Sequence, residues 1–396
     1  MHVQLWSYNY DPEPTGIGPV SKTLAEGLRD RGHHVQVVAA HPHYPVKQWG
    51  RCARPYREER NGIPVLRLPL WVGRGSAMER YRQELTFMAS QFAALPFLGR
   101  PDVIVSASPS FPALLPALVN VRVRRVPWLL WLQDILPDGA TSTGIVKSAL
   151  VLDSARRLER LAYKGADRVV VLSGAFTRNL LAKGVPEKKI DVIYNPATRT
   201  PRSLDRRANG IRVLGMGNIG FSQGLAPLVE AYERSTAIRE SNIPLVITGD
   251  GVAAEDVRSR VRSKRVNMPG IVDDDRLEEE LCRASIGLVS QHYEGAEFNT
   301  PSKLMNFMTY GLPILAAVNP DGEVARIVQD SNAGWVVDSS DPGAFPAKVA
   351  DLASAPDEVA RRGEAARAYA ERHFGRAGFA EHFECSLGKT LQASLR

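Results

Sequence analysis

Lys303 is the residue whose position most strongly indicates chemistry. It follows Pro301 and Ser302 where a helical pattern begins, and that pattern ends before Gly311. Ser302 is explained as the residue that caps the helix, but a lysine in the first turn is mildly unfavourable because the amino end of a helix is electropositive. An anion bound at the same place would remove this conflict. We therefore favour an anion-binding role for Lys303 over that of a solvated surface lysine.

Two glycine-rich turns earlier in the chain offer backbone amides to an anion. Residues 215–220 read Gly-Met-Gly-Asn-Ile-Gly after a β-type run, and residues 249–251 read Gly-Asp-Gly after the next run. The first turn matches the G-x-G-x-x-G pattern of dinucleotide sites, which is a weak signal by itself. Glu233 and Glu240, the candidates for the acidic residue that binds ribose, fall in helical patterns and not at a strand end. What remains is a glycine-rich loop whose amides can bind a diphosphate.

Four positions in the first half could contact a second ligand. Gly16 and Gly18 lie between the first predicted strand and a helix, where glycines let the backbone approach a ligand closely. The alternative is a tight turn without a ligand, and the place of the loop beyond a strand favours binding. Asp134 follows a very apolar strand, and its carboxylate fits a structural cap and a catalytic group equally well. His43 lies in a polar loop that could touch a substrate.

The sequence offers no convincing metal site. His41 and His43 are close together, but no cysteine or carboxylate at metal-like spacing accompanies them. Asp273, Asp274 and Asp275 precede a helical pattern, and acidic residues at a helix start are the ordinary explanation. We expect no metal in the site.

These residues need strands whose ends bring their loops together. β-type runs and helical patterns alternate along the whole chain, which predicts parallel sheets with crossover helices. A polar, turn-rich stretch at 195–202 separates two such series. The predicted fold is α/β, with two doubly wound Rossmann-like domains facing a cleft, since ligands of open sheets bind beyond the carboxyl ends of the strands. We place the domains at 1–197 and 198–377, and a last helix within 378–396 that continues the second domain or packs back on the first.

The expected elements are as follows. The strands of the first domain are residues 3–8, 35–40, 65–68, 103–106, 128–132 and 169–172, and its helices are 19–31, 78–95, 145–164 and 174–183. The strands of the second domain are residues 211–216, 245–248, 286–290 and 314–318, with helices between them, including one from 224 to 234.

Composition excludes several classes of protein. The 396 residues are 44% hydrophobic and 23% charged, as in soluble globular proteins and unlike disordered or fibrous chains. The three cysteines are far apart, which argues against a disulfide framework or a zinc module and favours a reducing compartment. The first residues lack the pattern of a signal peptide, and no segment reaches the ~20 apolar residues of a membrane-spanning helix. We expect a cytoplasmic protein.

The net charge of +7 is unevenly distributed. Residues 1–200 hold 27 Lys and Arg against 16 Asp and Glu, whereas residues 201–396 hold 23 against 27. A basic first half fits nucleic acid, an anionic membrane surface or a phosphorylated substrate, and also an incidental surface charge. The segment 68–98 combines large apolar residues with arginines. Core packing explains it slightly better than a helix at a membrane interface.

Taken in order, the motifs resemble those of glycosyltransferase family 4 over nearly the whole chain. The set comprises Gly16-Ile17-Gly18, Gly217-Asn218-Ile219-Gly220 with Gln223-Gly224, Gly249-Asp250-Gly251, and Pro301-Ser302-Lys303-Leu304 before Gly311-Leu312-Pro313-Ile314. Residues 8–18 and 133–138 are further similar to the subgroup that builds colanic acid and O-antigen, which includes fucosamine transferases. The resemblance implies the GT-B fold, a nucleotide-diphosphate sugar as donor, retention of anomeric configuration and no metal.

The chain departs from the family's pattern where the family usually binds the donor diphosphate. Asn218 and Gln223 stand at places that commonly hold an Arg and a Lys. Lys303 is then the chief remaining cation near the diphosphate, assisted by loop amides and helix N-termini. We expect its removal to be severe.

The family's two glutamates are also replaced. The one usually found on the nucleotide ribose falls at Asn306, and the one usually found on the sugar falls near Phe298, with Glu294 and Glu297 as displaced substitutes. The implied catalytic residues are Lys303, Asp134, which would orient the acceptor hydroxyl, and Glu297. The implied donor-binding residues are Gly217, Asn218, Gln223, Gly249, Asp250, Asn299, Thr300, Ser302 and Asn306. The implied acceptor-binding residues are Gly16, Gly18 and His43.

We predict a retaining hexosyl- or N-acetylhexosaminyltransferase. Its donor is a nucleotide sugar, with a UDP-sugar favoured, and its acceptor is a lipid-pyrophosphate-linked saccharide in surface polysaccharide assembly. It would use no cofactor and no nucleic acid, and could work peripherally on the inner face of the cytoplasmic membrane. Two alternatives are a transferase with a soluble small-molecule acceptor and a non-catalytic sugar-nucleotide-binding protein. A nicotinamide-dependent dehydrogenase rests on one glycine motif and is the least favoured.

Overall fold

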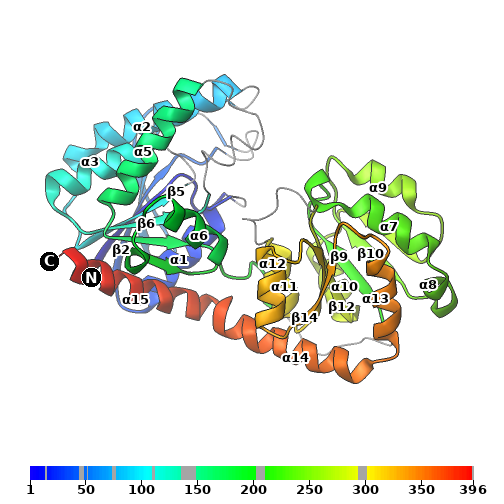
Figure 1. Ribbon diagram of the computed structural model, residues 1–396. Coiled ribbons are helices and arrows are strands. Elements are labelled where there is room, and N and C mark those ends of the chain that lie inside the picture. The colour runs from blue at the N-terminus through cyan, green and yellow to red at the C-terminus, as the bar shows by residue number, and fades with distance from the viewer. Residues whose placement is uncertain are drawn as a thin grey trace. The chain divides into compact units, whose positions relative to one another are not determined.

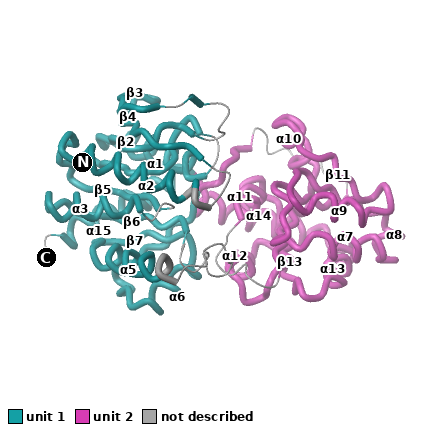
Figure 2. Tube along the Cα trace, turned by 90° about the horizontal axis from the view of Figure 1, so that it is seen from above, with its two compact units in different colours: residues 1–195, 376–396 teal, residues 196–375 magenta. Residues whose placement is uncertain are grey.

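The chain divides into two compact units in a computed structural model (Figure 2). Unit 1 comprises residues 1–195 and 376–396, and unit 2 comprises residues 196–375. Each boundary lies two residues before the one predicted from the sequence. The structure describes residues 1–13, 16–43, 49–50, 52–73, 77–108, 112–134, 149–201, 210–292 and 301–394.

Unit 1 is built on an eight-stranded sheet of order β3-β4-β2-β1-β5-β6-β7-β8 (Figure 1). The strands pair in parallel, except that β3 and β4 form an antiparallel pair at one edge. The bounds are β1 His2–Ser7, β2 His34–Ala40, β3 Tyr56–Arg60, β4 Ile63–Leu68, β5 Val103–Ser108, β6 Trp128–Leu132, β7 Arg168–Val171 and β8 Ile190–Val192. The described helices of this unit are α1 Gly18–Asp30, α2 Ala77–Ala94, α3 Leu114–Arg124, α5 Ala149–Gly165, α6 Gly174–Ala182 and α15 Arg376–Ser394.

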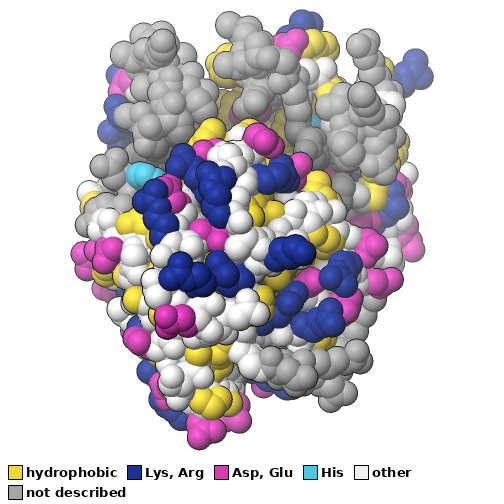
Figure 3. Space-filling model, turned by 90° about the vertical axis from the view of Figure 1, so that its right-hand side faces the viewer, with side chains coloured by type: hydrophobic (Ala, Val, Ile, Leu, Met, Phe, Trp, Pro, Cys, Tyr) yellow, Lys and Arg dark blue, Asp and Glu magenta, His cyan; other side chains and the backbone are white. Residues whose placement is uncertain are grey.

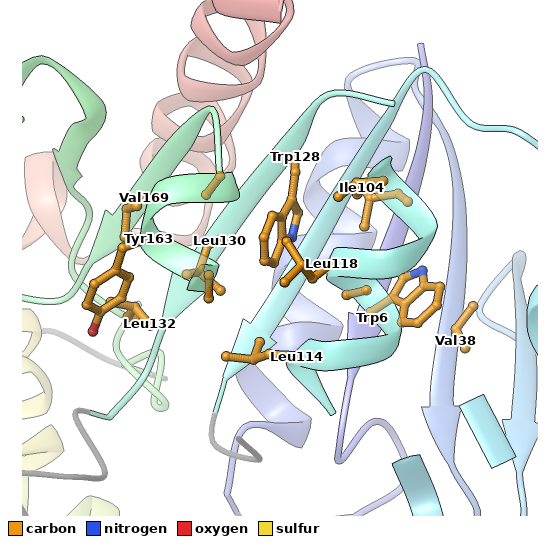
Figure 4. Close-up of a cluster of buried hydrophobic side chains, with 14 of the residues drawn as sticks. Trp6, Val38, Ile104, Leu114, Leu118, Trp128, Leu130, Leu132, Tyr163 and Val169 are labelled. Atoms are coloured by element: carbon orange, nitrogen blue, oxygen red, sulfur yellow. The ribbon is translucent and has the colours of Figure 1, made fainter. Parts of the chain in front are cut away.

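Both faces of this sheet are buried. Trp128, Leu130 and Leu132 of β6 pack into a core with residues of α2, α3 and α5 (Figure 4), whereas Leu129 and Trp131 pack with α1 and α15 on the other face. Successive side chains of a strand point to opposite faces, so a strand that is apolar at every position must be covered on both sides. The apolar run Trp-Leu-Leu-Trp-Leu therefore requires β6 to lie in the middle of the sheet, with helices on both faces.

Unit 2 has a six-stranded parallel sheet of order β11-β10-β9-β12-β13-β14. Its strands are β9 Val213–Met216, β10 Leu245–Thr248, β11 Val266–Gly270, β12 Ile286–Ser290, β13 Ile314–Val318 and β14 Gly334–Asp338. Its described helices are α7 Leu225–Arg234, α8 Thr236–Ser241, α9 Ala254–Arg260, α10 Asp274–Arg283, α11 Ser302–Thr309, α12 Glu323–Asp330, α13 Ala344–Ala353 and α14 Pro356–His373. The predicted two-domain α/β fold with parallel sheets is confirmed.

Four strands and one helix were not expected from the sequence. The edge strand β3 reads Tyr-Arg-Glu-Glu-Arg, and the three-residue β8 and the Pro-containing β11 lack an apolar run. The helix α3 contains Pro116, and β14 begins at a glycine. Pairing with a neighbouring strand, and not local pattern, creates such edge strands.

The last helix, α15, belongs to unit 1. Its residues Phe379 and Phe383 lie with their ring centroids 6.0 and 5.0 Å from that of Trp131 in β6. Glu384 accepts hydrogen bonds from Arg31 Nε at 2.6 Å and lies 2.9 Å from His33 Nε2. Of the two packings considered for this segment, the structure has the one on the first domain. Among the described residues, no helix combines the length and the apolarity needed to cross a membrane.

Candidate active site

The strand order of unit 2 places a topological switch point at β9 and β12. From β9 the chain moves outward through β10 and β11, and it then returns to β12 on the other side of β9. Ligands of open α/β sheets bind beyond the carboxyl ends of the strands at such a switch point. Asn218 and Gln223 follow β9, and Lys303 lies at the start of α11, the helix that comes after β12.

The loop after β9 presents backbone amides at this point. Gly217 has φ +101°, and no atom lies within 4 Å of the position a Cβ would take, so the backbone there faces open space. In the described part of the chain, no acceptor is recorded for the N–H groups of Asn218, Gly220 and Ser222. Such unpaired amides before a helix suit an anion. The predicted role of this loop in diphosphate binding stays a prediction.

The turn at 249–251 packs against the backbone of the loop after β9. A Cβ on Gly249 would stand 1.9 Å from the carbonyl oxygen of Gly217, and one on Gly251 would stand 2.5 Å from that of Ile219. Ile219 also donates its N–H to Asp250 O at 2.9 Å. Close contact between two backbones thus explains the glycines at 249 and 251. Asp250 is exposed, and its carboxylate accepts from the Gly251 amide at 2.9 Å.

Lys303 lies in the first turn of α11 and reaches the loop after β9. Its Nζ donates to Gln223 Oε1 at 2.5 Å, and Gln223 Nε2 donates in turn to the carbonyl oxygen of Asn218. No carboxylate is ion-paired with Lys303 among the residues that the structure describes. Burial lowers the pKa of Lys303 to about 8, because the ammonium loses hydration. The sequence did not indicate the contact between Gln223 and Lys303.

The start of α11 corrects one expectation. Pro301 is the N-cap, no side chain caps the helix, and Ser302 is the first helical residue. Ser302 therefore does not cap α11 as predicted, because the preceding proline, with its extended backbone, already ends the loop. Among the residues that the structure describes, no side chain caps the first N–H groups of α11, and Lys303 belongs to this first turn.

The side-chain amide of Asn306 forms hydrogen bonds within unit 2. Its side chain is 5% exposed, and its Oδ1 accepts hydrogen bonds from the N–H groups of Thr198 and Arg199, both at 3.1 Å. Its Nδ2 donates to the Thr198 hydroxyl at 3.0 Å. Asn306 therefore fastens the segment after residue 195 to α11. A direct contact with the nucleoside stays a prediction.

The sugar-side candidates lie outside the described residues. They are Glu294, Glu297, Asn299 and Thr300, and Phe298 stands among them.

The first loop of unit 1 is built around two glycines with different roles. Gly16 has φ +66°, and the nearest atom to a Cβ there, Asn9 Oδ1, would be 3.5 Å away. Gly18 opens α1, and a Cβ there would stand 2.8 Å from the carbonyl oxygen of Glu13. Packing explains Gly18, whereas Gly16 leaves room near the backbone. Their predicted contact with an acceptor is not tested by this geometry.

His43 supports this loop from beneath. The side chain of His43 is fully buried. The backbone N–H of His43 donates to Glu13 Oε1 at 3.1 Å, and the side-chain Nδ2 of Asn9 donates to the same oxygen at 2.9 Å. The His43 Nδ1 lies 3.0 Å from the carbonyl oxygen of His41. His43 thus positions the loop in this structure, and its predicted contact with an acceptor stays a prediction. Sequence reasoning missed the buried Glu13, although it lies within the motif at 8–18.

Asp134 is exposed just beyond β6. The preceding Gln133 exchanges two side-chain hydrogen bonds with Asn195, at 3.1 and 2.9 Å, and fixes the end of the strand. Asp134 therefore lies at the carboxyl edge of the sheet of unit 1, and its predicted role toward an acceptor stays a prediction. Among the described residues, no three His, Cys, Asp or Glu side chains group as a metal site would require.

Comparison with known proteins decides the family. A family model described as "Glycosyl transferase 4-like domain" matches residues 15–196, and one described as "Glycosyl transferases group 1" matches residues 210–355. The chain belongs to the family 4 glycosyltransferases with the GT-B fold. The two matches meet at the boundary between the two units.

Curated relatives are similar over most of the chain. The colanic acid biosynthesis glycosyl transferase WcaI of Escherichia coli is 27% identical over 337 residues, which are 78% of this chain and 82% of WcaI. The glycosyltransferase WbjE of Pseudomonas aeruginosa is 25% identical over 265 residues, 62% of this chain and 64% of WbjE.

A solved structure shares the fold. Anabaena HepE in complex with UDP superimposes with a TM-score of 0.69 at 15% identity, covering 98% of this chain and 100% of HepE. This likeness shows the GT-B architecture of two parallel-sheet domains.

Proposed function

We propose that this glycosyltransferase retains anomeric configuration and moves a sugar from a UDP-sugar to a lipid-pyrophosphate-linked saccharide in surface polysaccharide assembly. An N-acetylated amino sugar is one candidate for the transferred group. The colanic acid relative supports the process, and the HepE complex with UDP supports the nucleotide. The basic charge of residues 1–200 suits a diphosphate-bearing acceptor at the inner face of the membrane.

The observation that carries the proposal is the environment of Lys303. The Lys303 ammonium lies at the amino end of α11, and among the residues that the structure describes its hydrogen-bond partner is the neutral Gln223, with no carboxylate paired to it. A donor diphosphate would supply the missing negative charge. As the bond to the sugar breaks, charge develops on the leaving diphosphate, and a preorganised cation with loop amides stabilises that charge most where water is excluded.

The remaining steps use few protein groups. In a front-face transfer, the leaving phosphate itself takes the proton of the acceptor hydroxyl, so no protein base is required. We assign to Asp134 the orientation of that hydroxyl, and to Glu297, Asn299 and Thr300 contacts with the sugar. Neither the phosphate chemistry nor these contacts call for a metal or another cofactor.

The nucleotide can be identified by thermal shift. A ligand that binds only the folded state raises its melting temperature, by an amount that grows with concentration above Kd. We expect UDP to raise the melting temperature more than GDP, ADP or dTDP at equal concentration. A clear shift by GDP alone would overturn the choice of donor.

Transfer needs a separate assay. We expect hydrolysis of a UDP-sugar by the purified chain, and faster transfer when lipid-linked acceptor is supplied. Failure to turn over any UDP- or GDP-sugar with that acceptor present would contradict the proposal.

Asn218 and Gln223 favour one second candidate, a protein that binds sugar nucleotides without catalysis. They bring no positive charge to the place where the family commonly has two cations. Tight UDP-sugar binding without turnover would support this candidate. A transferase with a soluble acceptor would in turn be favoured by turnover together with an absence of binding to anionic vesicles at low salt.

A further inference from the structure

An apolar groove lies beside α2 in unit 1, next to β4 and the edge strand β3. Figure 2 shows β3 and β4 at one edge of this unit. The groove consists of two adjoining cavities of about 530 and 360 Å³, which share Pro69 and Ser90 in their walls. The apolar lining of the larger one includes Leu66, Leu68, Ala93 and Phe97. Phe97 is 77% exposed, which is unusual for so large an apolar side chain.

The polar groups of the groove are already used by its own walls. The Ser90 hydroxyl donates to Pro69 O at 2.6 Å, and the Thr86 hydroxyl donates to Gln83 O at 2.9 Å while accepting from Trp71 N at 3.0 Å. A hydrocarbon chain needs no hydrogen-bond partner, and its burial against these apolar side chains is favourable.

Charge is concentrated at the borders of the groove. Residues 85–99, which supply one wall, contain no charged residue, so the described charged groups beside the groove come from β3 and from the first half of α2. Arg57 lines the larger cavity and is exposed, and the Arg82 guanidinium lies 4.4 Å from the centroid of the Trp71 ring. The surface therefore matches an amphiphile with an apolar chain and an anionic head.

Hydrogen bonds connect the wall of the smaller cavity with the segment that leads to Gly16 and Gly18. Trp71 lines that cavity, and two residues later Gly73 donates its N–H to Gln83 Oε1 at 3.1 Å. Gln83 Nε2 donates to the hydroxyl of Tyr8 at 2.6 Å. Tyr8 directly follows β1, where that segment begins.

We propose that this groove binds the hydrocarbon chain of the lipid diphosphate acceptor. The hydrocarbon chain would lie along α2 from Phe97 toward Trp71. The diphosphate would be held at the Trp71 end, beside Arg82. This inference rests on the proposed function, and it adds a binding site to it. It also assigns a role to the aromatic and basic segment 68–98.

The test uses geranylgeranyl diphosphate as the probe and isothermal titration with the full chain. Ala93→Trp fills the groove from an exposed position of α2, so the fold is preserved. Ala89→Trp is the matched control, because Ala89 is exposed one turn earlier and lines neither cavity. We expect the parent and Ala89→Trp to bind the probe at least tenfold more tightly than inorganic diphosphate, and Ala93→Trp to lose at least tenfold in affinity. The thermal shift by UDP should be equal in all three.

Three results would overturn the groove. They are equal probe affinity in the two tryptophan variants, equal affinity for the probe and inorganic diphosphate, and a loss by Ala93→Trp of binding to phosphatidylglycerol vesicles while probe affinity is unchanged. The last would make the groove a membrane-docking surface. Failure of the proposed function looks different: probe binding that depends on Ala93 in a chain that transfers no sugar would support the groove and contradict the transfer.

Discussion

Lys303 combines two features that are costly in the absence of a ligand. It places a cation at the electropositive end of α11, and it is buried enough for its pKa to fall to about 8. Gln223 offers it a single neutral acceptor. Both costs become favourable terms once a diphosphate binds, which is why this residue is the centre of the proposed mechanism.

Replacing Lys303 by alanine should slow transfer severely. Loss of one group that stabilises developing negative charge lowers kcat by about 10²–10³. The measurement is the initial rate with saturating UDP-sugar. Lys348→Ala is the matched control, because Lys348 is a lysine of unit 2 on the surface of α13, and we expect it to keep the parental rate. Turnover by Lys303→Ala at the parental rate would refute the assignment.

The pKa of Lys303 also predicts proton uptake on donor binding. Above pH 8 the free chain holds Lys303 mostly neutral, and the bound diphosphate raises the pKa again, so binding of UDP takes up a proton. Affinity for UDP should fall by up to about tenfold per pH unit above this pKa. Titration calorimetry at pH 8.5 in buffers of different ionisation enthalpy measures the uptake. Lys303→Arg should show none, because arginine stays protonated; equal uptake by both chains would contradict the prediction.

The two loops around β9 and β10 act as one element. Gly249 has φ +122° and lies against the carbonyl oxygen of Gly217. The turn after β10 therefore fixes the position of the loop after β9, whose backbone amides form the candidate anion site. The site therefore depends on backbone packing as much as on side chains.

Gly249→Ala should destabilise unit 2 through this contact. The methyl group would clash with Gly217 and the backbone would be strained, at a total cost of about 3 kcal/mol. Gly270→Ala is the control: Gly270 has φ +80° with no atom near its Cβ position, so strain alone costs about 1 kcal/mol. Urea unfolding followed by circular dichroism measures both. Equal midpoints for the two variants would show that the contact does not matter.

At the scale of the whole molecule, the chain crosses twice between its units. α15 returns to unit 1 after the end of unit 2 and lies beside α1 (Figure 1). Its phenylalanines complete the core on one face of the first sheet. Unit 1 is thus assembled from both ends of the chain.

Phe383→Ala should lower the stability of unit 1 selectively. Phe383 is fully buried against Trp131, and a Phe-to-Ala change in a core costs about 3–5 kcal/mol. Tryptophan fluorescence reports the effect, because five of the six tryptophans lie in unit 1. Phe345→Ala, in the core of unit 2, is the control and should leave that fluorescence transition in place. An unchanged transition in Phe383→Ala would mean that α15 does not stabilise unit 1.

Charge at this scale is less simple than the division by halves indicated. Residues 201–396 are net acidic, yet five of the eight residues 258–265 are Lys or Arg. The face of the molecule in Figure 3 shows Lys and Arg side chains gathered among acidic ones. Two arginines of the segment 258–265 are neutralised locally: Arg258 pairs with Glu255 at 3.1 Å and Arg260 with Glu230 at 2.7 Å.

The sequence by itself determined the central strands, the helix start at Asp273 and the glycine loops, because these depend on local pattern and on which faces are apolar. Asp273 caps α10 by accepting from Arg276 N at 2.8 Å, as its place before the helix predicted. The edge strands β3 and β11 escaped prediction because pairing creates them.

Only the tertiary structure decided what the candidate side chains contact. It placed Lys303 on Gln223, buried His43 beneath the first loop, turned Asn306 toward Thr198 and brought α15 back to unit 1. Each of these contacts joins residues that are at least 30 positions apart in the chain. Local propensity carries no information about such partners, since the free energy that selects them comes from burial and from hydrogen bonds formed only in the folded chain.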